Sequence, residues 1–319
     1  MLGFVRSASP SALIIAIGLL VGVSFTLSKY VAMSDVPAFL ALFWQVAVAS
    51  AALLGLLFAT RITPPTAPRY IGYYLGAGLL GVSLPALIGY VVLEHITTGF
   101  YSALVTLSPM FTFAITAMVE RRMLPLHRLL GLLIGFAGIS LATLRGLDTS
   151  AIEPTWILLA LSGPFVLASG NVFRSRVYPA GADPMALAAG TLFLQLALIG
   201  ATLLVSGRLA EIAALKPMVF AAITGIGLIT AISYALTFEV QRRTDGVGFS
   251  QVGYFATLSG ITFGAIAFRE ELSLAFIAAL LLIFLGLAIT SGHLSRSHFR
   301  QAAGLPRFRR CRPRPNPLH

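Results

Sequence analysis

Charged residues are scarce in this chain. Aspartate, glutamate, lysine and arginine make up only 10% of the 319 residues, whereas hydrophobic residues make up 57%. An ordinary soluble domain carries about 25% charged residues. Because the chain lacks the residues to build a polar shell, a sizeable water-soluble domain is excluded and a membrane protein is favoured.

The residues of common catalytic and metal sites are also missing. Cys311 is the single cysteine, so an intramolecular disulfide is excluded and a thiolate metal site would lack partners. The five histidines form no H-E-x-x-H motif, a G-x-S-x-G elbow is absent, and every aspartate falls in a predicted connection. The sequence therefore predicts a protein that is not an enzyme, with no catalytic residue, metal or cofactor.

Lysine occurs only twice, at Lys29 and Lys216, and neither follows a glycine-rich phosphate loop. This excludes a pump driven by ATP bound to this chain. An ion channel normally needs a ring of charges or carbonyl groups, usually from several subunits. A membrane receptor or a channel without alternating access stays open as the alternative to a transporter.

The chain consists instead of apolar runs of about 20 residues, the length that crosses a hydrocarbon core of roughly 30 Å. The runs are continuously apolar rather than alternating, which favours helices over barrel strands. The fold class predicted is an all-α membrane protein with ten transmembrane helices. The predicted spans are 11–33, 37–60, 69–93, 97–119, 124–145, 154–177, 184–206, 217–240, 247–269 and 272–293.

The basic residues predict the orientation. The net charge is +11, and with the N-terminus in the cytoplasm most arginines, Arg61, Arg174 and Arg243 among them, fall at cytoplasmic span ends or in the C-terminal tail. Both termini are therefore expected on the cytoplasmic side of a bacterial-type inner membrane. The charges are interpreted as topogenic, so lipid is an expected partner and nucleic acid is not. The arginine-rich segment 294–319 is predicted to be a disordered cytoplasmic tail.

A weak internal repeat runs through the chain. Thr106 and Thr257 are 151 residues apart, and the same offset relates Gly135 to Gly286. Each half holds five spans, an odd number, so the second half is expected upside down relative to the first. Inverted repeats are the common architecture of secondary transporters, with the binding site near the midplane where the halves meet. The two predicted repeats are residues 11–145 and 154–293.

Several short motifs follow one another in an informative order. They are Ser24-Phe25 and Ser28-Lys29 near the end of the first span, Leu107-Ser108-Pro109-Met110-Phe111 in a fourth span that ends at Glu120, Gly131, Gly135 and Gly138 in the fifth span, and Tyr254 through Glu271 with Gly286 in the second half. In these features the chain resembles the EamA family of the drug/metabolite transporter (DMT) superfamily over almost all of residues 11–293. Gly260 stands where that family's pattern has a central proline in the ninth helix.

The resemblance implies ten helices around a central cavity and transport by alternating access. It also implies a small-molecule substrate, such as an amino acid, nucleobase, vitamin or drug-like metabolite, with export as the expected direction. A homodimer stays open.

Charge is missing at mid-span, so neutral polar and aromatic side chains are the candidates for substrate contact. The amides should face the bundle interior, because an unpaired amide in hydrocarbon is costly, and a helix–helix hydrogen bond is their alternative role. Prolines within spans can kink a helix and act as gates, or form a static kink. The substrate-binding candidates are Ser24, Gln45, Tyr90, Thr106, Asn171, Ser233, Tyr234, Gln251 and Tyr254, and the gating candidates are Pro85, Pro109 and Gly260.

The acidic residues fall at predicted span ends rather than at mid-span. Glu239 is the deepest of them, and Arg243, four residues on, is placed to pair with it. Because a buried carboxylate at mid-span is lacking, the sequence offers no obvious proton relay. Facilitated exchange or uniport is therefore as open as proton antiport.

Overall fold

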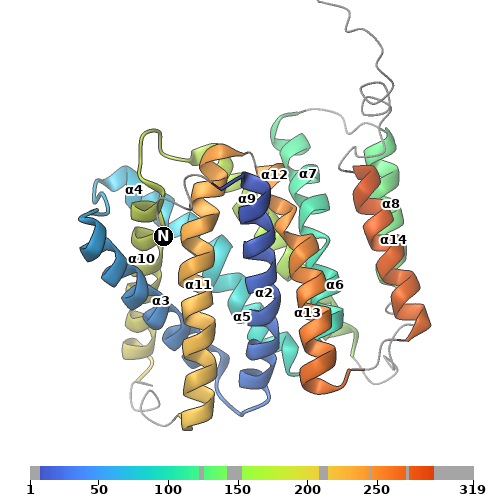
Figure 1. Cartoon of the computed structure of the whole chain (residues 1–319), viewed down its shortest axis with the longest axis horizontal. Helices are drawn as coiled ribbons and strands as arrows, with labels where there is room; N and C mark the ends of the chain where they lie inside the picture. The colour runs from blue at the N-terminus through green and yellow to red at the C-terminus, as the bar shows by residue number, and fades with distance from the viewer. Residues whose placement is uncertain are drawn as a thin grey trace, which may run out of the picture.

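The computed structural model describes residues 8–121, 126–141, 153–207, 215–244, 246–270 and 273–290. Within these ranges every regular element is a helix, and Figure 1 shows the long helices standing side by side in one bundle. The predicted tail 294–319 lies outside the described residues. The elements are α2 (Pro10–Ala32), α3 (Ala38–Thr60), α4 (Pro68–Gly78), the π-helix η1 (Leu79–Ser83), α5 (Leu84–Leu93), α6 (Thr98–Val105), α7 (Ser108–Val119), α8 (Leu126–Leu141), α9 (Pro154–Val177), α10 (Pro184–Val205), α11 (Pro217–Arg243), α12 (Gly246–Ser250), α13 (Val252–Phe268) and α14 (Leu274–Thr290).

Eight helical segments of the described chain are long and apolar enough to cross a membrane. Two shorter apolar helices, α8 and α14, pack against each other, and Figure 1 shows them at one side of the bundle. The eight segments are Pro10–Ala32, Ala38–Thr60, Pro68–Leu93, Thr98–Val119, Pro154–Val177, Pro184–Val205, Pro217–Arg243 and Gly248–Phe268.

The outer surface of the bundle is apolar. Phe58 is 76% exposed and Val205 is 88% exposed, and large aliphatic side chains such as Leu158 and Leu281 are exposed on other helices. A soluble protein rarely leaves so much contiguous apolar surface uncovered. Together with the eight spanning-length helices, this surface identifies an integral membrane protein.

Helix starts follow local rules that satisfy backbone donors before the chain enters hydrocarbon. The Asp183 carboxylate accepts hydrogen bonds from the backbone N–H of Met185 and Ala186 at the start of α10, at 2.8 and 3.3 Å. Helices α4, α9, α10 and α11 each begin with a proline, whose missing N–H needs no partner at that position. Connections can therefore be short.

Glycines allow the closest helix contacts. A Cβ built at Gly22 of α2 would lie 2.6 Å from the backbone nitrogen of Gly260, and one at Gly18 would lie 2.8 Å from the Val252 carbonyl oxygen. The backbones of α2 and α13 are thus in direct contact, as is common where small residues line an interface in a membrane. Gly286 of α14 is equally close to the backbone of Gly135 in α8.

Three predicted spans are interrupted rather than regular. The third changes to a π-helix at η1, where the Leu84 N–H bonds to the Leu79 carbonyl just before Pro85, which has no N–H of its own. The fourth breaks between α6 and α7, immediately before Pro109. The ninth breaks at Gln251, between α12 and α13. Each interruption lies at or next to the central cavity described below.

Candidate functional site

A cavity of about 200 Å³ lies at the centre of the bundle. Its walls come from α2, α3, η1, α5, α6, α7, α9, α11, α12 and α13, so both halves of the chain contribute. Most of the lining is apolar, with aromatic rings from Phe25, Tyr101, Tyr234 and Phe249. A mostly apolar pocket with a few convergent polar groups is the usual form of a small-molecule site.

Five of the nine predicted substrate-binding residues line this cavity, and so does one predicted gating residue. The remaining predicted residues are outside the lining. Those that line it are Ser24, Gln45, Asn171, Ser233, Tyr234 and Pro85. Those outside it are Tyr90, Thr106, Gln251, Tyr254, Pro109 and Gly260.

Gln45 joins three helices through its amide. Its Nε2 donates to Thr230 Oγ1 at 2.9 Å, and its Oε1 accepts from the Tyr90 hydroxyl at 2.9 Å. Tyr90 is therefore buried directly behind Gln45 rather than at the cavity wall. The expectation that Gln45 faces the interior is confirmed, and its amide is already hydrogen-bonded.

Thr106 lies in the contact between α6 and α13. Its hydroxyl forms a very short hydrogen bond with that of Thr257, and the Thr257 hydroxyl also lies 2.7 Å from the Ser102 carbonyl oxygen. Both threonines are fully buried. This pair holds the two halves together beside the cavity.

The other predicted residues outside the lining make helix contacts. The Tyr254 ring stacks on Phe284 of α14 with the ring centroids 6.0 Å apart, and Gln251 marks the break between α12 and α13. Gly260 lies inside the continuous helix α13, where a Cβ would be 2.0 Å from Ser102 Oγ. Pro109 is the second residue of α7, and its ring would lie 3.6 Å from a Cβ at Gly253.

Arg174 is a charged residue of the cavity wall, although its position at a span end predicted a place at the cytoplasmic surface. Its side chain is only 3% exposed. Long helical side chains point back toward the helix N-terminus, which directs this guanidinium from the end of α9 into the bundle. Its spacing of three residues from Asn171, which puts both on one helix face, is the signal that could have revealed it.

Polar contacts hold the Arg174 guanidinium in place on one side. Nε donates to Gln241 Oε1 at 3.0 Å, and Nη2 donates to Asn171 Oδ1 at 2.9 Å. Nη1 is buried and has no hydrogen-bond partner among the described residues. It lies against Gly81 of η1, where a Cβ would be 2.0 Å from Nη1 and 2.4 Å from the Tyr234 hydroxyl.

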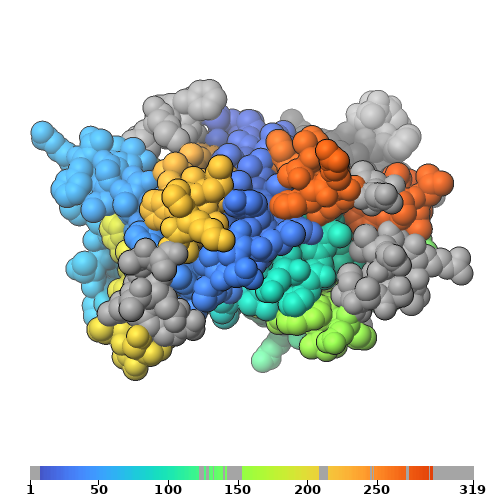
Figure 2. Space-filling model, turned by 90° about the horizontal axis from the view of Figure 1, so that it is seen from below, coloured from blue at the N-terminus to red at the C-terminus, as the bar shows by residue number. Residues whose placement is uncertain are grey.

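One end of the bundle is closed by an ion pair. Lys29 Nζ lies 3.2 Å from Glu270 Oε1, and the side chains are only 12% and 7% exposed. The same carboxylate accepts from the backbone N–H of Thr98 and Gly99 at the start of α6, at 2.7 and 2.9 Å. Figure 2 looks onto this end, and atoms of the α2–α3 region (blue) fill the middle of the face.

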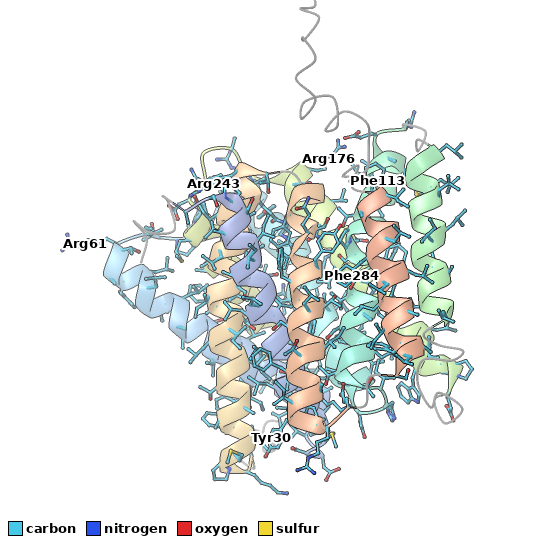
Figure 3. All side chains as sticks on the ribbon, turned by 45° about the vertical axis from the view of Figure 1, so that its right-hand side comes forward. Tyr30, Arg61, Phe113, Arg176, Arg243 and Phe284 are labelled. Carbon is cyan, nitrogen blue, oxygen red and sulfur yellow. The ribbon has the colours of Figure 1, made fainter. Side chains whose placement is uncertain are left out.

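The opposite end is rich in arginine. Figure 3 places Arg61, Arg176 and Arg243 at this end and Tyr30 at the other. Glu239 accepts hydrogen bonds from Arg242 and Arg243, which confirms the expected pairing with Arg243.

A partly buried tyrosine also lies toward the arginine-rich end. Burial raises the pKa of Tyr178, so its hydroxyl stays protonated and donates to the Phe238 carbonyl oxygen at 3.3 Å. This bond ties the connection after α9 to α11.

A larger groove of about 650 Å³ lies on the flank of the bundle, between α3, α11 and the start of α10. Its walls are mostly apolar and include the exposed side chains Leu228 and Ile232, with Glu239 and Arg242 at the rim. It faces the apolar exterior of the molecule, whereas the central cavity collects polar groups from both halves. The central cavity is therefore the better candidate for a specific site.

The structure is thus an apolar-surfaced helical bundle around a small, partly polar cavity. Residues 9–144 match the model of the EamA-like transporter family, a family of transporters rather than enzymes, which confirms the expected resemblance over this part of the chain. No curated protein sequence matches the chain. One solved crystal structure of a protein matches with a TM-score of 0.62 at 18% identity, covering 90% of this chain and 99% of that one. At this identity the likeness concerns the fold alone.

Proposed function

We propose that the protein is a secondary transporter that moves small organic metabolites across a bacterial-type inner membrane by alternating access, with export as its direction. The observation that carries the proposal is the central cavity between the two halves of the chain. The polar lining residues Ser24, Gln45, Asn171, Ser233 and Tyr234 are the proposed substrate contacts.

An inverted repeat is supported by contacts between equivalent residues. Thr106 bonds to Thr257, and Gly135 packs on Gly286, and both pairs are 151 residues apart. Residues on a two-fold axis meet their own equivalents in this way.

Helix pairings are consistent with the same axis. The contact between α2 and α13 has its counterpart between α9 and α7, and the contact between α3 and α11 has its counterpart between α10 and α4. Helices α8 and α14 occupy corresponding places and pack on each other. We therefore count them as the fifth and tenth spans of the transporter.

Alternating access requires that each end of the cavity open in turn. The Lys29–Glu270 pair is the proposed gate at one end, because it joins α2 to the carboxylate that holds the start of α6. Pro85, next to the π-helix, and Pro109, at the break before α7, are the proposed bending points. The arginine-rich end is placed in the cytoplasm, with both termini, by the positive-inside rule.

Uptake into proteoliposomes tests the transporter proposal. Purified protein is reconstituted and offered a mixed metabolite pool, with empty liposomes as control and with or without an imposed proton gradient. Saturable entry of a metabolite, read by mass spectrometry, is expected. Entry that requires the proton gradient would indicate a proton-coupled transporter. Entry without the gradient would indicate a facilitative carrier.

Two results contradict the proposal. A ligand that stabilises the protein but never crosses the bilayer indicates a receptor. Non-saturable flux of ions indicates a channel.

A further inference from the structure

We propose that the transported substrate is a small organic anion whose acidic group binds Arg174 in the central cavity. The inference rests on the proposed transport function and names the class of substrate. It begins from the charge of the cavity: among the described residues that line it, Arg174 is the only charged one, and none is an aspartate or glutamate. A low-dielectric cavity with a single cation in its wall attracts anions and repels cations.

The hydrogen bonding of the guanidinium is incomplete. Arginine carries five N–H donors in a planar fork, and among the described residues only Nε and Nη2 of Arg174 have partners. Nη1 is buried without a partner, and no carboxylate of the described chain lies within ion-pair distance of this side chain. A buried charge without a counter-ion is costly, so it marks a place where an anionic partner is stabilised.

Other hydrogen-bond donors lie at the same wall. Ser233 lines the cavity, and its Oγ is buried with no hydrogen-bond partner in the described part of the chain. The Tyr234 hydroxyl lies beside Gly81 together with Nη1 of Arg174. This hydroxyl donates to the Ala77 carbonyl oxygen in a long hydrogen bond of 3.4 Å. Hydrogen bonds between these donors and an anion would be charge-assisted, and such bonds are stronger than those between neutral groups. The planar guanidinium of arginine matches the geometry of carboxylates and phosphates.

The backbone of η1 makes room for this arrangement. Gly81 sits at the centre of the π-helix, and any Cβ there would overlap Nη1 of Arg174. Single π-helical turns occur frequently at functional sites, because they reorient the backbone around a ligand. The glycine and the π-helix together allow the guanidinium to reach the cavity wall.

Cavity size limits the body of the anion. A cavity of about 150 Å³ holds a benzene ring, and the central cavity measures about 200 Å³. The apolar and aromatic lining suits a flat or short apolar body rather than a sugar or a nucleotide. The site is therefore expected to take an anion of single-ring size.

Binding of benzoate to the full chain in lipid nanodiscs, measured by calorimetry and by thermal stabilisation, tests the assignment. Benzamide and benzylamine are the neutral and cationic controls of nearly the same shape. Benzoate is expected to bind more tightly than either by roughly tenfold or more, the effect of a hydrogen bond to a charged group. Phenyl phosphate, run in parallel, distinguishes a carboxylate site from a phosphate-ester site, and either preference supports an anion.

Substitutions locate the binding to Arg174. R174M is expected to remove the preference for benzoate, and R174K, which keeps the charge but loses the fork, is expected to retain part of it. R176M is the matched control, because Arg176 lies two residues on in the same helix, is 42% exposed and pairs with Glu120 outside the cavity. If R174M does not fold, R174K and G81A, which displaces the guanidinium without removing it, give the same comparison.

Equal binding of benzoate and benzamide to the unsubstituted protein, or unchanged benzoate binding in folded R174M, overturns the assignment. The metabolite-pool experiment separates this failure from failure of the transport proposal. If a neutral metabolite enters saturably and R174M transports it equally well, the transporter stands and the anion site is wrong. If no metabolite enters saturably, transport itself is wrong, whatever benzoate does.

Discussion

Individual side chains of this protein act mainly by joining helices across the bundle. Gln45 links α3 to α5 and α11, Arg174 links α9 to α11, and Glu270 links the segment after α13 to α2 and α6. Such bonds matter more than usual because the bundle exterior is apolar and an unpaired polar group in hydrocarbon is costly. The same contacts that stabilise the bundle also surround the cavity.

The Lys29–Glu270 pair gives a prediction at this scale. E270Q alone or K29M alone should lower the free energy of unfolding by roughly 3–5 kcal/mol, since each leaves a buried charge without its partner. The double variant should lose less than the sum of the two. Reversible unfolding in mixed micelles measures the loss.

The surface pair Arg176–Glu120 is the control for this cycle, because exposed pairs contribute about 0–1 kcal/mol. Additive losses at Lys29 and Glu270, or losses no larger than those of R176M, would show that the pair does not hold this end closed.

The threonine pair gives an asymmetric prediction. T257V should cost about 1 kcal/mol more than T106V. Without Thr257 the Thr106 hydroxyl keeps only a long bond of 3.4 Å to the Ser102 carbonyl. Without Thr106 the single proton of the Thr257 hydroxyl still has a close carbonyl acceptor, that of Ser102 at 2.7 Å or that of Gly253 at 2.8 Å. Thermal unfolding of the two variants, which have the same side-chain shape, measures the difference. Equal losses would mean that the contact between the hydroxyls dominates.

At the scale of the elements, two features determine how the helices meet. Glycines bring the backbones of α2 and α13 into contact, and the π-helix η1 bends the third span around the cavity. Both features arise from local backbone chemistry. Gly22 has no Cβ, so another helix can approach closely, and Pro85 has no N–H to donate within a regular helix.

The α2–α13 contact predicts an unequal response to one added methyl group. G22A should destabilise the protein by roughly 1–3 kcal/mol, because its Cβ would lie 2.4 Å from Ser259 Cβ and 2.6 Å from backbone atoms. G72A on α4 is the matched control, since a Cβ there meets nothing within 4 Å. Thermal unfolding in detergent compares the two. A G22A variant as stable as G72A would contradict the tight packing of these helices.

At the scale of the whole molecule, charge is distributed unequally between the two ends. Arg61, Arg176 and Arg243 gather at one end, and Tyr30, the neighbour of Lys29 in the sequence, lies at the other (Figure 3). In the orientation that we propose from the positive-inside rule, the arginine-rich end faces the cytoplasm. This arrangement makes the orientation and the number of spans testable together.

Cysteine labelling in intact cells tests that arrangement, in a C311S background. M33C and E153C should react with a membrane-impermeant maleimide added outside, whereas R61C should react only after the membrane is opened. Labelling of E153C from outside also requires that α8 cross the bilayer, because α7 ends at the arginine-rich end. The reverse pattern would overturn the orientation, and labelling of E153C only from inside would remove α8 from the count of spans.

The sequence predicted much of the fold, because apolar runs long enough to cross a bilayer leave few alternatives to helices. The predicted spans 37–60 and 154–177 agree with α3 and α9 to within a residue. Candidate site residues were predicted less completely. Ser233 and Tyr234 line the cavity, but Tyr254, chosen for the same ring chemistry, packs on α14. The residue type shows that a side chain is polar or aromatic. It does not show which face of its helix lines the cavity.

By itself, then, the sequence determined the membrane class, the helical fold and the resemblance to EamA transporters, because hydropathy and short-range spacing are properties of single segments. Only the tertiary structure decided which polar groups converge. Arg174 has the sequence context of a topogenic arginine, and its burial depends on Gly81, Asn171 and Gln241, which come from three different helical segments. The charge of the cavity is a property of that packing, because a guanidinium at a span end can point either to water or into the bundle.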